Sequence, residues 1–152
     1  MTIASRLTQD PIAADAELRT FMAGLTDAGA VVSFCGVARG ATRSGEKVEA
    51  LHLDHYPGMT ERSLDEIAQA GAARFEVSDV MVIHRCGTIR PGETIVFVAT
   101  ASSHRRAAFL AADYLMDRLK TEAVFWKKEQ GVDAERWIEP TDEDRSDRDR
   151  WR

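Results

Sequence analysis

The sequence has almost nothing that would tie it to a membrane, a secretory route or a disulfide framework. Its first residues, MTIASRLTQDP, lack the basic segment and the continuous apolar stretch of a secretory signal. No apolar run approaches the roughly 20 residues that a membrane-spanning helix needs. The two cysteines, Cys35 and Cys86, show no CxxC spacing, so neither a disulfide framework nor a zinc site is indicated. We therefore expect a cytoplasmic protein that acts without a membrane.

Several common catalytic motifs are also missing. The chain contains no GxxxxGKS or GxxxxGKT phosphate loop, no GxGxxG, no HExxH and no GxSxG. Among the histidines, His52, His55 and His84 are predicted to be strand-surface or core residues. His84 and Cys86 share a strand face, but two ligands do not make a zinc site. We expect no metal site and no cofactor.

The composition is that of one folded domain with an uneven distribution of charge. The 152 residues are 44% hydrophobic and 30% charged, which is typical of a globular domain with a single core. The net charge of −5 argues against nucleic acid as the main partner. Residues 84–128 nevertheless carry eight Lys or Arg against four Asp or Glu, whereas residues 139–152 carry six acids against four Arg. This basic centre predicts a small anionic ligand.

The spacing of apolar residues predicts an α+β domain with a mixed sheet. The turn at Arg90–Glu93 is predicted to join two strands in a hairpin. The tail is dense in acids and arginines and is predicted to be mobile or an exposed helix. We therefore divide the chain into one domain, residues 1–140, and a charged, mobile tail, residues 141–152. The predicted strands are 3–7, 30–37, 48–56, 78–84, 94–101, 124–129 and 136–139, and three predicted helices carry residues 18–25, 64–75 and 103–120.

A set of basic residues lies at the predicted ends of strands and helices, where binding sites are commonly assembled. Arg39 and Arg105 can hold a phosphate through forked donors, although surface ion pairs with the many acids are the commoner role of such arginines. His104 at a helix start can be a phosphate donor or a helix cap. Lys120 and Lys127 can act as nucleophile or base if neighbouring cations lower their pKa, or can lie over apolar surface with the ammonium group in water.

Five segments together resemble the large-subunit family of molybdopterin synthase. They occur in the family's order and cover about residues 29–137, which makes the resemblance far more specific than any one short motif. The segments are GAVVSFCGVARG (29–40), LHLDHYPGMTE (51–61), VIHRCGTIRPGE (82–93), SSHRRAAF (102–109) and LKTEAVFWKKE (119–129).

The resemblance implies a fold, an assembly and a reaction. The fold is an α/β hammerhead-type single domain with a mixed sheet, a hairpin and about three helices. The assembly is a homodimer with a small ubiquitin-like sulfur-carrier subunit at each end, which makes a heterotetramer. In the implied sulfurtransferase reaction, the thiocarboxylated C-terminus of the small subunit gives sulfur to cyclic pyranopterin monophosphate, forming the dithiolene of molybdopterin.

The resemblance also assigns the site. Lys120 and Lys127 are implied to be catalytic, acting on the thiocarboxylate and on the sulfur-transfer intermediates, with their division of roles left open. Val124 stands where the family usually has proline, so we expect a looser approach to Lys127. The implied substrate-binding residues are Val37, Ala38, Arg39, His104, Arg105, Lys128 and Glu129.

Two other functions remain open on the sequence alone. One is a non-catalytic module that uses the same arginines to bind a phosphorylated small molecule. The other is a structural oligomerisation partner that assembles through its charged C-terminal face. Turnover of a pyranopterin substrate would separate the enzyme from both.

Overall fold

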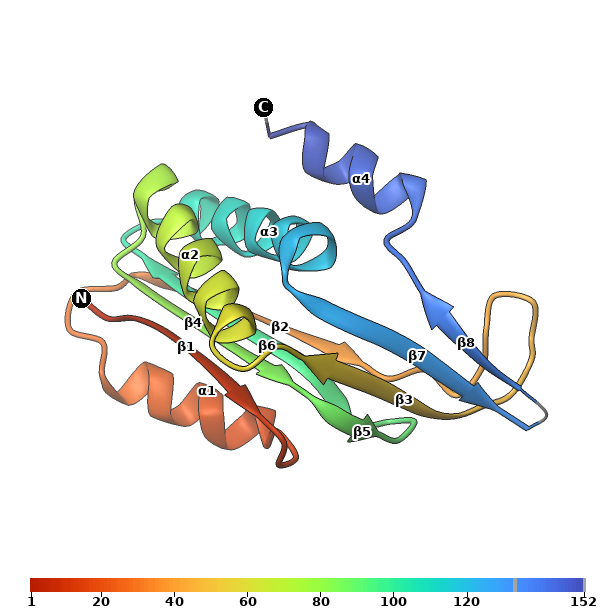
Figure 1. The fold of residues 1–152 in the computed structure, drawn as a ribbon. Helices are drawn as coiled ribbons and strands as arrows, with labels where there is room; N and C mark the ends of the chain where they lie inside the picture. Colours follow the sequence, from red (N-terminus) through yellow and green to blue (C-terminus); the bar gives the residue numbers. More distant parts are fainter. Residues whose placement is uncertain (133, 152) are drawn as a thin grey trace.

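The fold is built from two four-stranded β-sheets and the helices that pack on them (Figure 1). The computed structural model describes residues 1–132 and 134–151 of the chain. Within those residues the elements follow one another as β1 (Ile3–Thr8), α1 (Ala14–Ala23), β2 (Ala30–Val37), β3 (Val48–His55), α2 (Met59–Arg74), β4 (Asp79–Arg85), β5 (Gly87–Ile89), β6 (Thr94–Ser102), α3 (Arg105–Glu122), β7 (Phe125–Gly131), β8 (Glu135–Ile138) and α4 (Asp142–Asp149).

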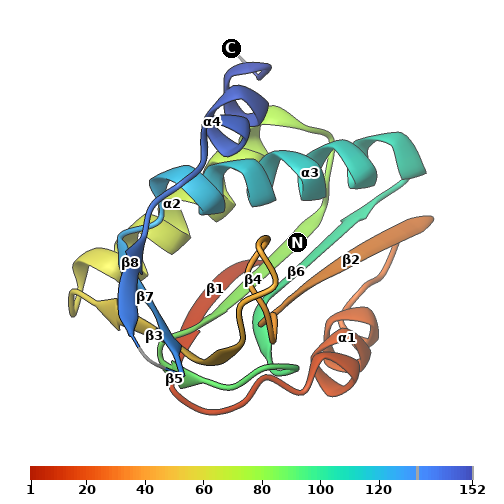
Figure 2. The same ribbon diagram turned by 90° about the vertical axis from the view of Figure 1, so that its right-hand side faces the viewer.

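The first sheet carries the main hydrophobic core. Its strand order is β1-β4-β6-β2, with β1 parallel to β4 and the other pairs antiparallel. Helices α2 and α3 cover one face and α1 lies on the other (Figure 2). Successive side chains of a strand point to opposite faces, so Val82 and Val98 pack in the cluster with Leu115, whereas Ile83 and Phe97 pack in the cluster with Phe21. This double burial explains why β4 and β6 are almost continuously apolar.

The second sheet has the order β5-β3-β7-β8 and is antiparallel throughout. The chain passes from the first sheet to the second between β4 and β5, where Gly87 has a φ of +86° that a side chain would disfavour. A small core cluster of Ala38, Leu53 and Ile89 joins the second sheet to the loop after β2. The inner face of the second sheet is thereby held close to the end of β2.

The predicted fold class is confirmed, since the chain is a single mixed α+β domain. Strands β4 and β6 pair antiparallel, as the predicted hairpin requires, and the predicted strand at 136–139 is present as β8, which pairs with β7. The three-residue strand β5 escaped prediction because it is too short to show a period. The described residues also form a fourth helix, α4, in the segment predicted to be mobile or an exposed helix. Its mobility stays a prediction.

Gly29 is expected to be intolerant of a side chain because it packs directly on backbone. A Cβ built there would lie 2.4 Å from the carbonyl oxygen of Ser103, at the entry to α3. Gly29→Ala should therefore lower the free energy of unfolding by about 1–3 kcal/mol, the usual cost of overpacking. At Gly24 a Cβ would meet nothing nearer than 3.8 Å, so Gly24→Ala is the matched control. Chemical denaturation of both variants checks this, and equal stabilities would contradict it.

Candidate active site

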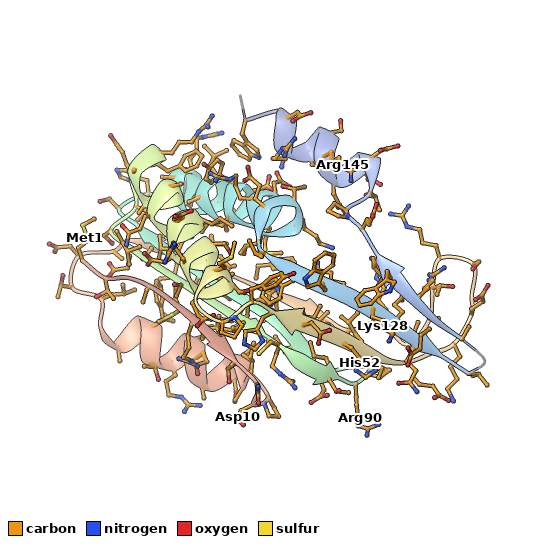
Figure 3. The ribbon with its side chains drawn as sticks, in the orientation of Figure 1. Met1, Asp10, His52, Arg90, Lys128 and Arg145 are labelled. Carbon is orange, nitrogen blue, oxygen red and sulfur yellow. The ribbon has the colours of Figure 1, made fainter. Side chains whose placement is uncertain are left out.

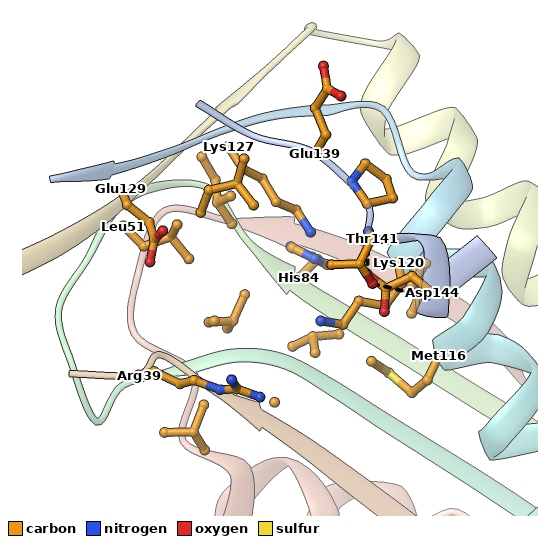
Figure 4. Close-up of a pocket in the computed structure, with 18 of the residues that line it drawn as sticks. Arg39, Leu51, His84, Met116, Lys120, Lys127, Glu129, Glu139, Thr141 and Asp144 are labelled. Atoms are coloured by element: carbon orange, nitrogen blue, oxygen red, sulfur yellow. Dashed lines mark hydrogen bonds between the residues drawn. The ribbon is translucent and has the colours of Figure 1, made fainter. Parts of the chain in front are cut away.

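A cavity of about 560 Å³ lies between the C-terminal end of α3, the second sheet, the end of β2 and the segment leading into α4 (Figure 4). Figure 4 shows the nitrogen ends of Lys120, Lys127 and His84 turned toward the same space, with Arg39 across from them. The charged and polar residues of its lining include Arg39, His84, Lys120, Lys127, Glu129 and Asp144.

The two lysines reach the cavity from consecutive elements. Lys120 lies in the last turn of α3, and Lys127 lies on β7. Alternation along β7 turns Lys127 toward the cavity, while Trp126 is 52% exposed. Burial lowers the pKa of Lys127, and the charge of Lys120 lowers it further, against an opposing effect of Asp144. Lys127 is thus a lysine that gives up its proton more readily than a solvated one.

The connection between the two lysines is tied to α2. The Val124 carbonyl accepts a hydrogen bond of 2.6 Å from the Thr60 hydroxyl, and the Val124 N–H donates to Ser63 Oγ at 3.2 Å. Proline at this position would lack that second bond. These two hydrogen bonds therefore fix the turn, a role that the expected proline would otherwise have.

Backbone hydrogen bonds fix the residue before Arg39 to the turn that precedes β6. The Ala38 N–H donates to the Glu93 carbonyl, and the Gly92 N–H donates to the Ala38 carbonyl, both at 2.9 Å. The Glu93 carboxylate in turn accepts from the Arg90 N–H at 2.6 Å, which helps to keep the pKa of Glu93 low. Ala38 itself is buried, so its part is to fix the direction of Arg39.

His84, which the sequence predicts to be a strand-surface or core residue, closes the floor of the cavity. It is 4% exposed and stacks on Phe125, with ring centroids 4.3 Å apart. Its Nδ1 lies 2.8 Å from the Arg85 carbonyl oxygen. Burial lowers the pKa of His84 to about 4; the hydrogen bond to Arg85 opposes this shift, and the charges of Lys127 and Lys120 add to it. The ring is therefore neutral at neutral pH.

The segment that follows β8 supplies acidic groups on one side of the cavity. Thr141 caps α4: its hydroxyl accepts from the Asp144 N–H, and the Asp144 carboxylate accepts from the Thr141 N–H, both at 3.0 Å. Burial alone would raise the pKa of Asp144, but these bonds and the charges of Lys120 and Lys127 outweigh it and lower the pKa. Asp144 therefore stays ionised and faces both lysines.

Trp151 anchors the end of this acidic segment on the helical layer. Its ring packs edge-on against Phe75 and Tyr114, with centroids 5.7 and 5.6 Å away. The indole N–H donates to Asp117 Oδ2 at 2.6 Å. These partners belong to α3 and to the C-terminal end of α2, far from Trp151 in the sequence.

His104 and Arg105 lie at the opposite end of α3 from Lys120. Helix α3 has 18 residues, which corresponds to about 27 Å at 1.5 Å per residue. Arg105 instead lines a shallow surface hollow with Arg106, Phe109 and Leu110. Within one chain these two predicted substrate-binding residues are not brought to the cavity.

The remaining predicted residues divide between the cavity and the opposite face of β7. Val37 and Glu129 line the cavity. Lys128 does not: it forms an ion pair with Glu135, and its ammonium lies 5.4 Å from the ring centroid of Trp137. Figure 3 marks Lys128 and His52 on this second sheet. The alternation of β7 separates Lys128 from its neighbours Lys127 and Glu129.

The cavity offers unpaired positive charge to a ligand. Arg39, Lys120 and Lys127 make no ion pair with any other residue in 1–132 or 134–151. Glu129 is occupied, since its Oε1 accepts two bonds from Arg136 at 3.0 and 2.9 Å. The surface ion pair that composition favoured for Arg39 is therefore not formed, and the arrangement suits an anion.

The described residues lack two further kinds of feature. No group of three or more His, Cys, Asp or Glu side chains there is arranged to hold a metal ion. No helix in the same residues is long and apolar enough to cross a membrane.

Fold and site together define an α+β protein with a charged cavity built around two lysines. The chain belongs to the MoaE protein family, whose model matches residues 7–122. A molybdopterin synthase catalytic subunit of Caulobacter vibrioides is 51% identical over 148 residues, covering 95% of each chain. The protein of the same name from Yersinia pestis is 47% identical over 132 residues, 87% of each chain. The resemblance seen in the sequence is thus confirmed.

Solved structures agree with this membership. A molybdopterin biosynthesis MoaE protein from Burkholderia ambifaria is 40% identical and superposes with a TM-score of 0.82 over 97% of each chain. Molybdopterin synthase from Staphylococcus aureus is 28% identical, with a TM-score of 0.77 over 87% of this chain and 94% of that one. The fold extends to a complex of subunits 1 and 2 of the molybdopterin-converting factor from Helicobacter pylori, at 15% identity and a TM-score of 0.73.

The opposing effects of Lys120 and Asp144 on Lys127 can be measured. Asp144→Asn removes the charge that raises the pKa of Lys127, so that pKa should fall; Lys120→Met removes a repulsive charge, so it should rise. Glu143→Gln is the matched control, since Glu143 also lines the cavity but pairs with Arg43. Titration of the lysine side-chain carbons by NMR checks the signs. A rise of the Lys127 pKa in Asp144→Asn would be incompatible with this electrostatic account.

Proposed function

We propose that this chain is the catalytic subunit of a molybdopterin synthase. In this proposal it moves sulfur from the thiocarboxylated C-terminal glycine of a small ubiquitin-like subunit to cyclic pyranopterin monophosphate, which forms the dithiolene of molybdopterin. The observation that carries it is the joint presence of Arg39, Lys120 and Lys127, none of them ion-paired with another described residue, around one cavity. The names of the relatives supply the reaction class.

The charges of both reactants match the cavity. A thiocarboxylate and a phosphate monoester are anions, and cations in a partly desolvated cavity attract them far more strongly than cations in water do. Arg39 is suited to the phosphate because its guanidinium offers a fork of donors. Lys120 and Lys127 are suited to the acyl end, where negative charge develops on oxygen or sulfur during transfer. The chain's own groups and water suffice, so no cofactor is required.

We assign His104 and Arg105 to the cavity of a second copy of this chain. Because α3 holds them about 23 Å from Lys120 along the helix axis, they reach a substrate bound beside Lys120 only from a neighbouring molecule. A homodimer in which each α3 start serves the other copy's cavity satisfies this distance. One small subunit at each end completes a heterotetramer, and we place the reaction in the cytoplasm.

The two lysines should be required for turnover. Lys120→Ala and Lys127→Ala are each expected to lower kcat by roughly 10²–10³-fold, because each removes a cation from the reacting centre. The readout is the fluorescent oxidised pterin formed after incubation with the thiocarboxylated small subunit and the pyranopterin. Lys47→Ala, an exposed lysine outside the cavity lining, is the control for loss of a lysine.

If the chain were only a binding module, the unaltered protein would bind the pterin and yield no dithiolene product. Turnover that survives both lysine substitutions would equally contradict the proposal.

A mixing experiment tests whether two copies share each site. Chains carrying Lys120→Ala and chains carrying Arg105→Ala, each weakly active alone, should recover activity when refolded together. Random pairing makes half of the dimers mixed, and each mixed dimer has one intact site, so about a quarter of the full activity is expected. Lys120→Ala mixed with Lys127→Ala is the control, because those two residues line the same chain's cavity. No recovery in the first mixture would reject the shared site.

A further inference from the structure

His84 has a free lone pair directed at the cavity. Its Nδ1 lies 2.8 Å from the Arg85 carbonyl oxygen, and a carbonyl only accepts, so Nδ1 carries the hydrogen. The neutral ring then has its lone pair on Nε2. Nε2 has no hydrogen-bond partner within the described part of the chain, and His84 lines the cavity together with Lys120 and Lys127.

The ring cannot easily turn to exchange its nitrogens. It stacks on Phe125 with planes 26° apart and is almost fully buried. Phe125 belongs to β7, two residues before Lys127, so the same strand holds the stacking ring and one of the lysines. The histidine and the lysines are therefore set in position by packing before any ligand enters.

Sulfur transfer to a carbon atom creates a step that needs a base. When the thiocarboxylate sulfur bonds to the substrate carbon, it remains bonded to the acyl carbon of the small subunit. A nucleophile must then attack that acyl carbon to free the sulfur. Water is one nucleophile and the amine of Lys120 is the other, and water must lose a proton as it attacks.

We propose, building on the sulfur transfer proposed above, that His84 is the catalytic base of this acyl-release step. Nε2 takes a proton from a water molecule as the water oxygen bonds to the acyl carbon. The carbon–sulfur bond breaks, and the proton passes from Nε2 to the departing sulfur. The sulfur stays on the pterin as a thiol, and the small subunit leaves as a carboxylic acid that then ionises.

The other groups of the cavity are less suited to this step. The Arg39 guanidinium is always protonated and has no lone pair to offer. Glu129 accepts two hydrogen bonds from Arg136 on Oε1, and Asp144 accepts one from the Thr141 N–H on Oδ2, so both carboxylates are already partly engaged. The lysines serve better as ammonium groups that hold the anionic reactants. His84 is the neutral nitrogen that remains.

Substrate binding should strengthen His84 as a base. In the free protein burial lowers its pKa, and Lys127 on β7 and Lys120 on α3 lower it further. Asp144 on α4 faces the same lysines and offsets part of their charge. A bound phosphate and acyl group add negative charge, which raises the pKa of His84 toward the range in which a base is effective. Proton transfer is thus favoured when the cavity is filled.

The decisive variant is His84→Asn, because the asparagine amide can still donate to the Arg85 carbonyl while the Nε2 acceptor is lost. His52→Asn is the matched control; His52 hydrogen-bonds Thr88 and Gln130 on the second sheet, outside the cavity lining. We expect kcat for dithiolene formation to fall roughly 10²–10⁴-fold in His84→Asn, the range for loss of a general base. KM should change less than about threefold, since ground-state contacts remain.

The same variant should divert the acyl group to Lys120. An amide between the Lys120 Nζ and the small subunit's last glycine is expected to accumulate in His84→Asn, visible by intact-mass spectrometry. It should vanish when Lys120→Arg is added. An unchanged kcat without this adduct would overturn the role of His84. Absence of product from the unaltered protein would instead reject the sulfur transfer itself.

A measurement on the unaltered protein covers the case in which His84→Asn fails to fold. Nitrogen-15 NMR of the assigned His84 ring should show hydrogen on Nδ1 and a bare Nε2. The titration midpoint of the ring should rise when inorganic phosphate and the small subunit with its ordinary carboxylate terminus are added. Hydrogen on Nε2, or a midpoint that does not move, would overturn the proposal.

Discussion

Two lysines, Lys120 and Lys127, face the same partly desolvated cavity, and the other features of the site depend on this placement. Lys120 ends α3 and Lys127 lies inward on β7, so the short turn between them sets their approach. Like charges in such surroundings repel, and the charge of Lys120 lowers the pKa of Lys127. The repulsion is relieved by an anion, whether the chain's own Asp144 or an incoming reactant. Anion binding and reactivity therefore have one physical origin.

The acidic C-terminal segment contributes to the electrostatics of the cavity. The sequence predicted this segment to be mobile or an exposed helix. In the structure Asp144 faces the two lysines, and Trp151 packs on α3 and on the C-terminal end of α2. The segment thereby supplies negative charge beside the two lysines. Before a ligand enters, the carboxylate of Asp144 already offsets part of the positive charge of the lysines. Its charge also raises the pKa of Lys127, against the larger effects that lower it.

Much of the fold followed from the sequence, because the apolar runs of β4 and β6 and the helical apolar periods of α2 and α3 are long enough to recognise. Within the site, the inward position of Lys127 follows from alternation along β7. The position of Lys128 on the opposite face of β7 follows from the same alternation, although the family resemblance had assigned both Lys127 and Lys128 to the site. The sequence predicted His84 only as a strand-surface or core residue, because its place in the cavity depends on β7 packing across β4, a contact between residues far apart in the chain. The separation of His104 from Lys120 can be predicted from the length of the helix alone. The role proposed for His104, by contrast, depends on a second chain.

The most direct test of the central claim is a structure of the complex with the thiocarboxylated tail of the small subunit bound. The account predicts that the terminal sulfur lies in the cavity, within hydrogen-bonding distance of the Nζ atoms of both Lys120 and Lys127. A tail that ends elsewhere, for example against Trp126 and Lys128 on the outer face of β7, would contradict it.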